Sequence, residues 1–345
     1  MAIPYSATTP PAVPPRTAPA GVRAGAPLTL VPTPLDALGL VKDDLREAER
    51  ELRGLVKSDV QAVSTVARYL TLAGGKRLRP ALTALGARCV ADNGPVARLM
   101  CCGELIHLGS LLHDDVVDDS ELRRGKLAAH VVHGNAASVL TGDFCLARAV
   151  LLAAEEGGHL AVTELARAVT EMAEGEVLQL QHAGDLDTPL ETYRDVIDRK
   201  SAALIAWCVA APALRCGDLE AAEALKAYGR GVGLAFQITD DVLDYRSGTG
   251  KQPGADLRER KVTLPLLLAF EEDPSLRPLL AAGAPSDELV QDLVARITVS
   301  GALDKALDVA RDSVDDAIVA LHRLPHSEGR DALESLGRYL VERTA

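Results

Sequence analysis

Two aspartate-rich segments carry the residues best suited to chemistry. Asp114 and Asp118 are four residues apart, as are Asp240 and Asp244, and both pairs end an apolar stretch with helical spacing. Residues four apart lie on one helix face, where unpaired carboxylates repel each other. Mg²⁺ prefers such hard oxygen ligands, and it completes its shell with water and phosphate oxygens. The two segments therefore predict magnesium ions around a diphosphate; the alternative for each is a solvated acidic helix end, which the repeat disfavours.

Two groups of cations lie near these segments in the chain. Residues 74–80, Gly-Gly-Lys-Arg-Leu-Arg-Pro, precede an expected helix, and Pro80 fits its first position. Cations beside a helix N-terminus suit a diphosphate, although a basic surface turn has the same pattern. Residues 123–126, Arg-Arg-Gly-Lys, follow the first aspartate segment within one loop. This loop is placed to fold over a metal-bound diphosphate or to form salt bridges with the acids of residues 118–121.

Other polar residues give weaker signals. Lys200, Lys251 and Lys261, each taken alone, have the character of surface lysines. His130 and His133 have HxxH spacing, but nothing nearby in the sequence completes a zinc site, so we predict that they bind no metal.

The spacing of apolar residues predicts the elements that must hold these groups. It is helical from residue 36 to the end, with no run of alternating strands. We expect helices near residues 38–55, 80–92, 95–119, 134–155, 159–183, 190–214, 219–245, 261–270, 287–298, 303–322 and 328–343, separated by turns rich in glycine. The predicted fold is an all-α, single-domain helical bundle around a central cavity.

Composition excludes several classes of protein. The 345 residues are 48% hydrophobic, only 3% aromatic, and carry a net charge of −12, which argues against nucleic acid as a partner. The six cysteines form no CxxC pair and lie among apolar residues, so we expect buried thiols in a cytoplasmic protein. The best apolar run, residues 202–214, is interrupted by Pro212 and is too short to span a membrane, so no transmembrane helix is expected.

The first 35 residues differ from the rest. Nine of the 19 prolines fall in the first 34 residues, and no acidic residue precedes Asp36. We predict a disordered Pro/Ala-rich tail over residues 1–35 and a helical domain over residues 36–345, with a transit peptide as the alternative for the tail.

Taken in chain order, these segments resemble the trans-isoprenyl diphosphate synthase family, and within it the bacterial long-chain synthases of the octaprenyl type. The resemblance covers about residues 40–345. It rests on Gly74–Pro80, His107, Leu111–Asp118, Arg123–Lys126, Glu174–Glu176, Lys200–Ser201, Phe236–Asp244 and Lys261–Pro265.

The resemblance implies a role for each of these residues. It assigns binding of isopentenyl diphosphate to Lys76, Arg79, His107 and Arg124. It assigns contacts with the allylic diphosphate to Arg123, Lys200, Ser201 and Gln237, helped by Lys251 and Lys261. Two to three Mg²⁺ ions are expected on Asp114, Asp118 and Asp240, with Asp115, Asp241 and Asp244 as supporting or water-mediated partners. Ser201 stands where the family often has Thr, and it keeps the hydroxyl.

The implied activity is a magnesium-dependent trans-prenyltransferase that condenses isopentenyl diphosphate with a farnesyl or geranylgeranyl starter. A homodimer is expected, with peripheral membrane contact for product release. The alternatives are a short-chain farnesyl or geranylgeranyl diphosphate synthase, a class I terpene cyclase, an inactive regulatory subunit and a structural metal-binding protein. Both aspartate segments are intact, which disfavours a regulatory subunit.

Two small residues bear on product length. Gly109 and Ser110 precede Asp114 by five and four residues, about one helical turn. Short-chain members of the family carry a bulky aromatic at this level, so the small residues predict an open passage and a long product. The alternative is that they permit close packing of two helices.

Overall fold

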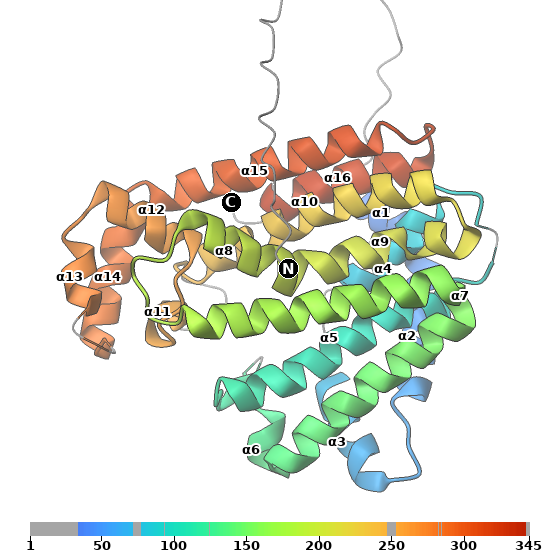
Figure 1. Ribbon diagram of the computed structural model, residues 1–345, viewed down its shortest axis with the longest axis horizontal. Coiled ribbons are helices and arrows are strands. Elements are labelled where there is room, and N and C mark those ends of the chain that lie inside the picture. The colour runs from blue at the N-terminus through green and yellow to red at the C-terminus, as the bar shows by residue number, and fades with distance from the viewer. Residues whose placement is uncertain are drawn as a thin grey trace, which may run out of the picture. The chain divides into compact units, whose positions relative to one another are not determined.

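Helices account for nearly all regular structure in the computed structural model (Figure 1). The structure describes residues 34–71, 77–92, 94–123, 125–246, 253–281, 283 and 285–342. The helices are α1 (Pro34–Leu40), α2 (Lys42–Leu55), α3 (Gln61–Thr71), α4 (Leu78–Ala87), α5 (Ala97–Val117), α6 (Ala129–His133), α7 (Asn135–Gln181), α8 (Leu190–Ile197), the π-helix η1 (Asp198–Ala202), α9 (Ala203–Cys216), α10 (Leu219–Leu243), α11 (Ala255–Arg258), α12 (Leu264–Glu272), α13 (Leu276–Ala281), α14 (Asp287–Val299), α15 (Ala302–Leu321) and α16 (Glu328–Glu342). Strands β1 (Leu122–Arg123) and β2 (Lys126–Leu127) form a small antiparallel hairpin.

Most predicted helices are present, and the differences have local causes. The expected first helix is interrupted at Val41, between α1 and α2. The expected helix over 190–214 consists of α8, η1 and α9, which run on without a turn. The short helices α6, α11 and α13 and the hairpin were not predicted, because they are too short to show a period. The helix α3 was also not predicted, although Val63, Val66 and Leu70 have helical spacing. The predicted tail lies outside the described residues, except that α1 begins at Pro34.

Turn residues end several helices as the sequence predicts. Gly217 has the left-handed conformation that closes α9, and the Asp218 side chain accepts from the backbone N–H of Ala221 to cap α10. Gly158, with φ of 73°, breaks the helical path inside α7. Pro212, in contrast, does not interrupt α9, because packing on every side of this helix outweighs the hydrogen bond that proline lacks.

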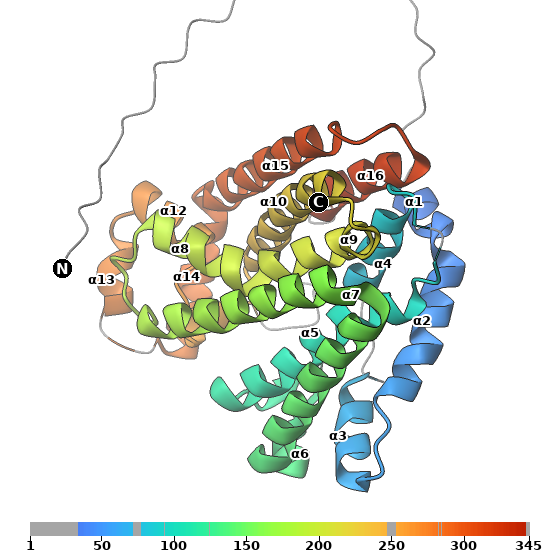
Figure 2. The ribbon, with the colours of Figure 1, turned by 45° about the vertical axis from the view of Figure 1, so that its right-hand side comes forward.

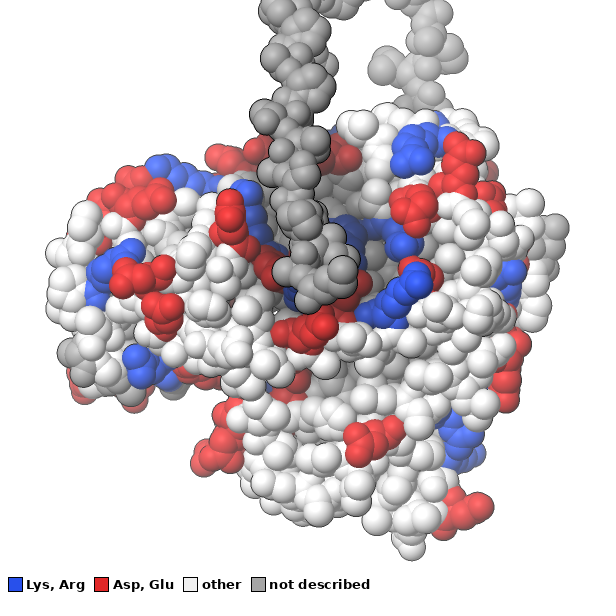
Figure 3. Space-filling view, in the orientation of Figure 1, with Lys and Arg blue, Asp and Glu red and all other residues white. Residues whose placement is uncertain are grey.

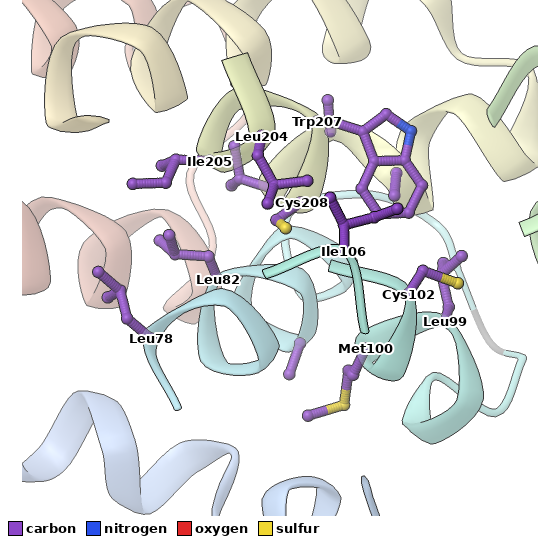
Figure 4. Close-up of a cluster of buried hydrophobic side chains, with 14 of the residues drawn as sticks. Leu78, Leu82, Leu99, Met100, Cys102, Ile106, Leu204, Ile205, Trp207 and Cys208 are labelled. Atoms are coloured by element: carbon purple, nitrogen blue, oxygen red, sulfur yellow. The ribbon is translucent and has the colours of Figure 1, made fainter. Parts of the chain in front are cut away.

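The main core is built around α9. Every residue from Ala203 to Leu214 is buried, and α9 packs against α4, α7 and α10. Figure 4 shows Leu204 and Trp207 of α9 directed toward side chains of α4 and α5. The Trp207 indole N–H donates to the carbonyl oxygen of Ala161 in α7 at 2.9 Å. This core fixes α5 and α10, which end in the two aspartate segments.

A second cluster of buried side chains lies at one end of the bundle (Figure 2). It joins the C-terminal half of α10 to α8 and to α12–α15. The loop between α10 and α12 is therefore held beside the second aspartate segment.

The cysteines largely follow the prediction. Five are buried, and burial raises the pKa of Cys89, Cys101, Cys145 and Cys208 to about 12. Cys216 is exposed at the end of α9, so the expectation of burial is wrong for this residue.

One helix has the length and composition of a membrane span. It is α7, with a mean hydropathy of 1.6 over its most apolar window, of which 39% is buried within the fold. The core helix of a globular protein can have the same properties, and Gly158 divides α7 into two parts.

Candidate active site

The first aspartate segment forms the end of α5, and its residues have different environments. Asp114 is partly buried, Asp118 lies at the C-terminal cap, and Asp115 is fully buried. The Arg123 guanidinium in β1 donates to Asp115 Oδ1 at 2.7 Å. The loop after α5 thus folds back over the segment, and Arg123 pairs with Asp115 rather than with an acid of residues 118–121. Asp115 Oδ2 has no hydrogen-bond partner within the described part of the chain.

Asp114 is an acid whose surroundings favour binding a cation. Its pKa is raised to about 6, first by burial and then by Glu176 and Asp118, against the lowering effects of Lys200 and Arg123. These neighbours come from α7, η1 and the hairpin, so three parts of the fold meet at this carboxylate. An added positive charge would restore the ionised form.

The three aspartates of the second segment point to different partners. Asp241 faces inward, where Tyr193 and Gln237 hold it, and burial raises its pKa to about 7 although these hydrogen bonds lower it. Asp244 accepts from the backbone N–H groups of residues 255 and 256 at 3.2 and 3.0 Å, at the start of α11. Asp240 lies close enough to Arg79 to raise the arginine pKa, against the larger lowering effect of burial.

Lys261 connects the two aspartate segments. Its ammonium lies 3.1 Å from Asp118 Oδ2 and 2.6 Å from Glu259 Oε2. Burial lowers the pKa of Lys261, but Glu259, Asp118 and Asp256 outweigh it and raise the pKa. Burial, and then Asp241 and Asp244, raise the pKa of Asp256 in turn. Two regions more than a hundred residues apart in the chain therefore share one electrostatic site.

Lys200 and Ser201 lie on the π-helix η1. The Lys200 ammonium is 2.8 Å from both Glu176 Oε2 and Gln179 Oε1 of α7. The Ser201 hydroxyl donates to Gln237 Oε1 at 2.7 Å. A π-helical turn inside an α-helical run often marks a functional site, because the extra residue redirects the side chains around it.

The basic segment before α4 is held by acids of two helices. Arg77, in the left-handed conformation, forms ion pairs with Glu49 of α2 and Glu104 of α5. Arg79 is partly buried, and its Nε has no hydrogen-bond partner among the described residues, as expected of a cation kept for a ligand. His107 lies on the adjacent face of α5, partly exposed.

Three predicted binding residues lie outside the described part of the chain: Lys76, Arg124 and Lys251. Cations and carboxylates otherwise gather around the hollow in the middle of the face shown in Figure 3.

The two residues expected to control product length differ in position. Gly109 faces α7, where an added Cβ would lie 3.0 Å from the Gly142 carbonyl oxygen and 3.2 Å from Leu146. Close helix packing, the alternative given above, accounts for this glycine, and its role in product length stays a prediction. Ser110 is partly exposed on the same face as Asp114, and its hydroxyl donates to the His107 carbonyl oxygen. Ser110 therefore has the position that the prediction of product length requires, on the helix face that carries Asp114.

Sequence reasoning assigned no role to three site residues. Tyr193 binds Asp241, Glu176 binds Lys200, and Asp256 lies beside Lys261. Glu176 was part of a matched segment, and Asp256 ends the linker of residues 250–256, which the family resemblance places over the substrate without assigning contacts. Nothing in the sequence around Tyr193 separates it from an ordinary core residue.

The donor set fits magnesium. No group of three or more His, Cys, Asp or Glu side chains in the described ranges could by itself hold a metal ion. Mg²⁺ needs only one or two carboxylates when substrate phosphates supply the other oxygens, and Asp114, Asp118 and Asp240 offer these. His130 and His133 lie in α6, where His130 Nε2 is 3.8 Å from Asp119 Oδ1 and the His133 ring packs edge-on against Tyr69.

An all-α bundle in which two aspartate segments and several cations share one electrostatic site defines a class of protein: a metal-dependent enzyme acting on diphosphates. Residues 60–297 match the family model described as polyprenyl synthetase. The chain belongs to this family, and it is a prenyltransferase, as predicted.

Individual relatives agree. The octaprenyl diphosphate synthase of Haemophilus influenzae is 38% identical over 315 residues, 88% of this chain and 95% of the relative. A crystal structure of a Caulobacter crescentus polyprenyl synthase, complexed with calcium and isoprenyl diphosphate, superposes with a TM-score of 0.86 at 41% identity, covering 91% of this chain and 98% of that one. The geranylgeranyl pyrophosphate synthetase of Pyrococcus horikoshii superposes with a TM-score of 0.80 at 30% identity, covering 90% of this chain and 99% of that one.

Proposed function

We propose that this enzyme elongates a farnesyl or geranylgeranyl diphosphate starter with isopentenyl diphosphate to a long-chain, all-trans polyprenyl diphosphate. The observation that carries the proposal is the electrostatic link between the two aspartate segments, from Asp118 through Lys261 and Asp256 to Asp241 and Asp244. A single diphosphate bound there would be surrounded by acids that hold metal ions and by lysines that contact its oxygens. The octaprenyl relative agrees with a long product.

The cations divide into two groups that suit two diphosphates. The first group consists of Arg79 in α4 and His107 in α5. Lys76 and Arg124, which are outside the described residues, are assigned to the same group from the sequence. We assign this group to isopentenyl diphosphate. Lys200, Ser201, Gln237 and Arg123, with Lys261 and Lys251 as helpers, are assigned to the allylic diphosphate.

The reaction requires the allylic C–O bond to break while water is kept away. Two to three Mg²⁺ ions, held by Asp114, Asp118 and Asp240, would neutralise the negative charge that develops on the leaving diphosphate. Lys200 and Lys261 contribute fixed positive charge that also stabilises the leaving diphosphate. The apolar core beyond Ser110 excludes water from the carbocation. The double bond of isopentenyl diphosphate attacks this carbocation, and the departing diphosphate accepts the proton that is lost.

Purified enzyme with Mg²⁺, radiolabelled isopentenyl diphosphate and farnesyl diphosphate tests the proposal. Chromatography of the dephosphorylated products should show a chain well beyond twenty carbons. Accumulation of farnesyl or geranylgeranyl products would establish the short-chain alternative instead, and a cyclic hydrocarbon would establish a terpene cyclase.

The oligomeric state and the cellular location of the enzyme are also proposals. We propose a homodimer in the cytoplasm, with peripheral membrane contact only when the lipid product leaves. Exposed apolar side chains on α7, among them Leu140, Leu151 and Val177, support a protein partner on this helix. The front of the lower part of the molecule in Figure 3, where α6 and the first half of α7 lie, is almost free of charge.

A further inference from the structure

One face of α10 is in backbone contact with the π-helix and α9. Gly229 and Gly233 lie on this face, four residues apart. A Cβ at these positions would lie 2.4 Å from Ala206 Cα and 2.5 Å from Ala202 Cα. Only glycine permits this approach, so the rotation of α10 about its axis is closely restricted there.

The same face continues with two polar residues at the same spacing, Gln237 and Asp241. Gln237 Nε2 donates to Asp241 Oδ1 at 2.8 Å, and Gln237 Oε1 accepts from Ser201 at 2.7 Å. The Tyr193 hydroxyl of α8 donates to Asp241 Oδ2 at 2.7 Å. Each group uses its natural donor or acceptor, and the donors Tyr193 and, through Gln237, Ser201 both lead to Asp241, which only accepts.

This arrangement separates Asp241 from metal binding. Both of its oxygens accept from neutral donors inside the fold, and only 6% of its surface is exposed. Burial, and then Asp241, raise the pKa of Tyr193 far above its usual range, so the hydroxyl remains a donor. Asp240 is the next residue along the helix, about 100° further around its axis. Holding Asp241 therefore sets the direction in which Asp240 points.

We propose that Tyr193 is a positioning residue for the metal-binding face of α10. Its hydroxyl anchors Asp241, and this anchor fixes both the direction of Asp240 and the amide orientation of Gln237. The assignment rests on the proposed function, in which Asp240 is a metal ligand. Removing partners that orient metal ligands commonly weakens metal binding by about 10–100-fold.

The test compares two single-atom deletions in the full chain. Tyr193→Phe removes the anchoring hydroxyl. Tyr228→Phe, the matched control, removes an equally buried hydroxyl that donates to the Leu333 carbonyl oxygen on another side of α10. Thermal stabilisation by Mg²⁺ in the presence of inorganic pyrophosphate is measured for both, together with turnover at each Mg²⁺ concentration.

Tyr193→Phe should raise the half-saturating Mg²⁺ concentration about tenfold in both measurements, whereas Tyr228→Phe should only lower the Tm. An unchanged Mg²⁺ midpoint for Tyr193→Phe, or an equal shift in the control, would overturn the assignment.

Asp241→Asn provides a second test if Tyr193→Phe does not fold. It should shift the Mg²⁺ midpoint in the same direction. Where Tyr193→Phe does fold, the double variant should be no worse than the worse single variant, because both act through one hydrogen bond. An unshifted midpoint, or fully additive effects, would contradict the proposal. A wild-type protein that shows no Mg²⁺-dependent stabilisation or turnover would instead refute the proposed function.

Discussion

At the scale of single residues, Asp114 couples metal binding to pH. Its pKa is raised to about 6, so the folded metal-free enzyme takes up a proton as the pH falls through this value. A metal ion must displace that proton. We predict that the half-saturating Mg²⁺ concentration is nearly constant above about pH 7 and rises as the pH falls below about 6. Mg²⁺ titrations of turnover between pH 5 and pH 8, each buffered at constant ionic strength, measure this directly.

The same pKa has a consequence for stability with a definite sign. Because the folded state binds the Asp114 proton more tightly than the unfolded state, it holds more protons between the two pKa values. The contribution of Asp114 therefore makes the metal-free protein more stable as the pH falls toward about 4, and Asp114→Asn should remove this dependence. A pH dependence of Tm that is identical in Asp114→Asn would show that the carboxyl titrates normally.

Single residues also test the division of the site into two diphosphate positions. Arg79→Ala should raise the KM for isopentenyl diphosphate by about tenfold or more, since it removes a charge-assisted hydrogen bond. Lys200→Ala should act mainly on the allylic substrate and on kcat. Each variant serves as the control for the other, and steady-state kinetics with both substrates varied separate the effects. Equal changes in both KM values for both variants would show that the assignment is wrong.

The residues that the sequence could predict are those whose type and spacing already imply chemistry. Paired aspartates four apart and clustered cations do so, whereas Tyr193 and Asp256 gain their meaning only from contacts between distant segments. For Gly109 the sequence left two interpretations open, because a small residue one turn from Asp114 fits both a passage and a helix contact. The distance from Gly142 that favours the helix contact is known only from the structure.

At the scale of elements, the contact between α5 and α7 separates two neighbouring residues. Ser110→Phe introduces a ring on the face shared with Asp114, so it should shorten the product while leaving the fold intact. Gly109→Phe should instead lower the Tm markedly, because a Cβ alone already meets α7 at 3.0 Å and overpacking costs about 1–3 kcal/mol or more. Product chromatography and thermal unfolding of the pair distinguish a passage from a packing contact.

The outcome would also be informative if reversed. A stable Gly109→Phe variant with shortened products would return Gly109 to the passage, and unchanged products in Ser110→Phe would place the limit on length elsewhere.

Element boundaries were predictable where apolar spacing extends over several turns, as in α5, α10 and α15. Spacing alone could not reveal that residues 198–202 form a π-helix, since this depends on hydrogen bonds within a continuous helical run. It also could not show that α9 continues through Pro212, because burial on every side of the helix is a property of its neighbours.

At the scale of the whole molecule, α7 exposes an apolar face that a partner could cover. Leu140 and Leu151 are 64% and 50% exposed, and Val177 and Leu180 are also more than half exposed. The helix is long and apolar enough to cross a membrane, but Gly158 breaks it, and its opposite face packs on α5 and α9. Because one face of α7 already packs in the protein core, we expect a second copy of the chain, rather than lipid, to cover its exposed apolar face.

We therefore predict that Leu140→Asp combined with Leu151→Asp converts the enzyme from dimer to monomer. Both side chains are exposed, so metal binding should persist, whereas Val319→Asp, the same kind of change at an exposed residue of α15, should leave the dimer unchanged. Light scattering after size-exclusion chromatography gives the mass, and flotation with liposomes tests the alternative. If the wild-type protein is a monomer that floats with liposomes, and the double variant no longer does, then lipid rather than a second subunit covers α7.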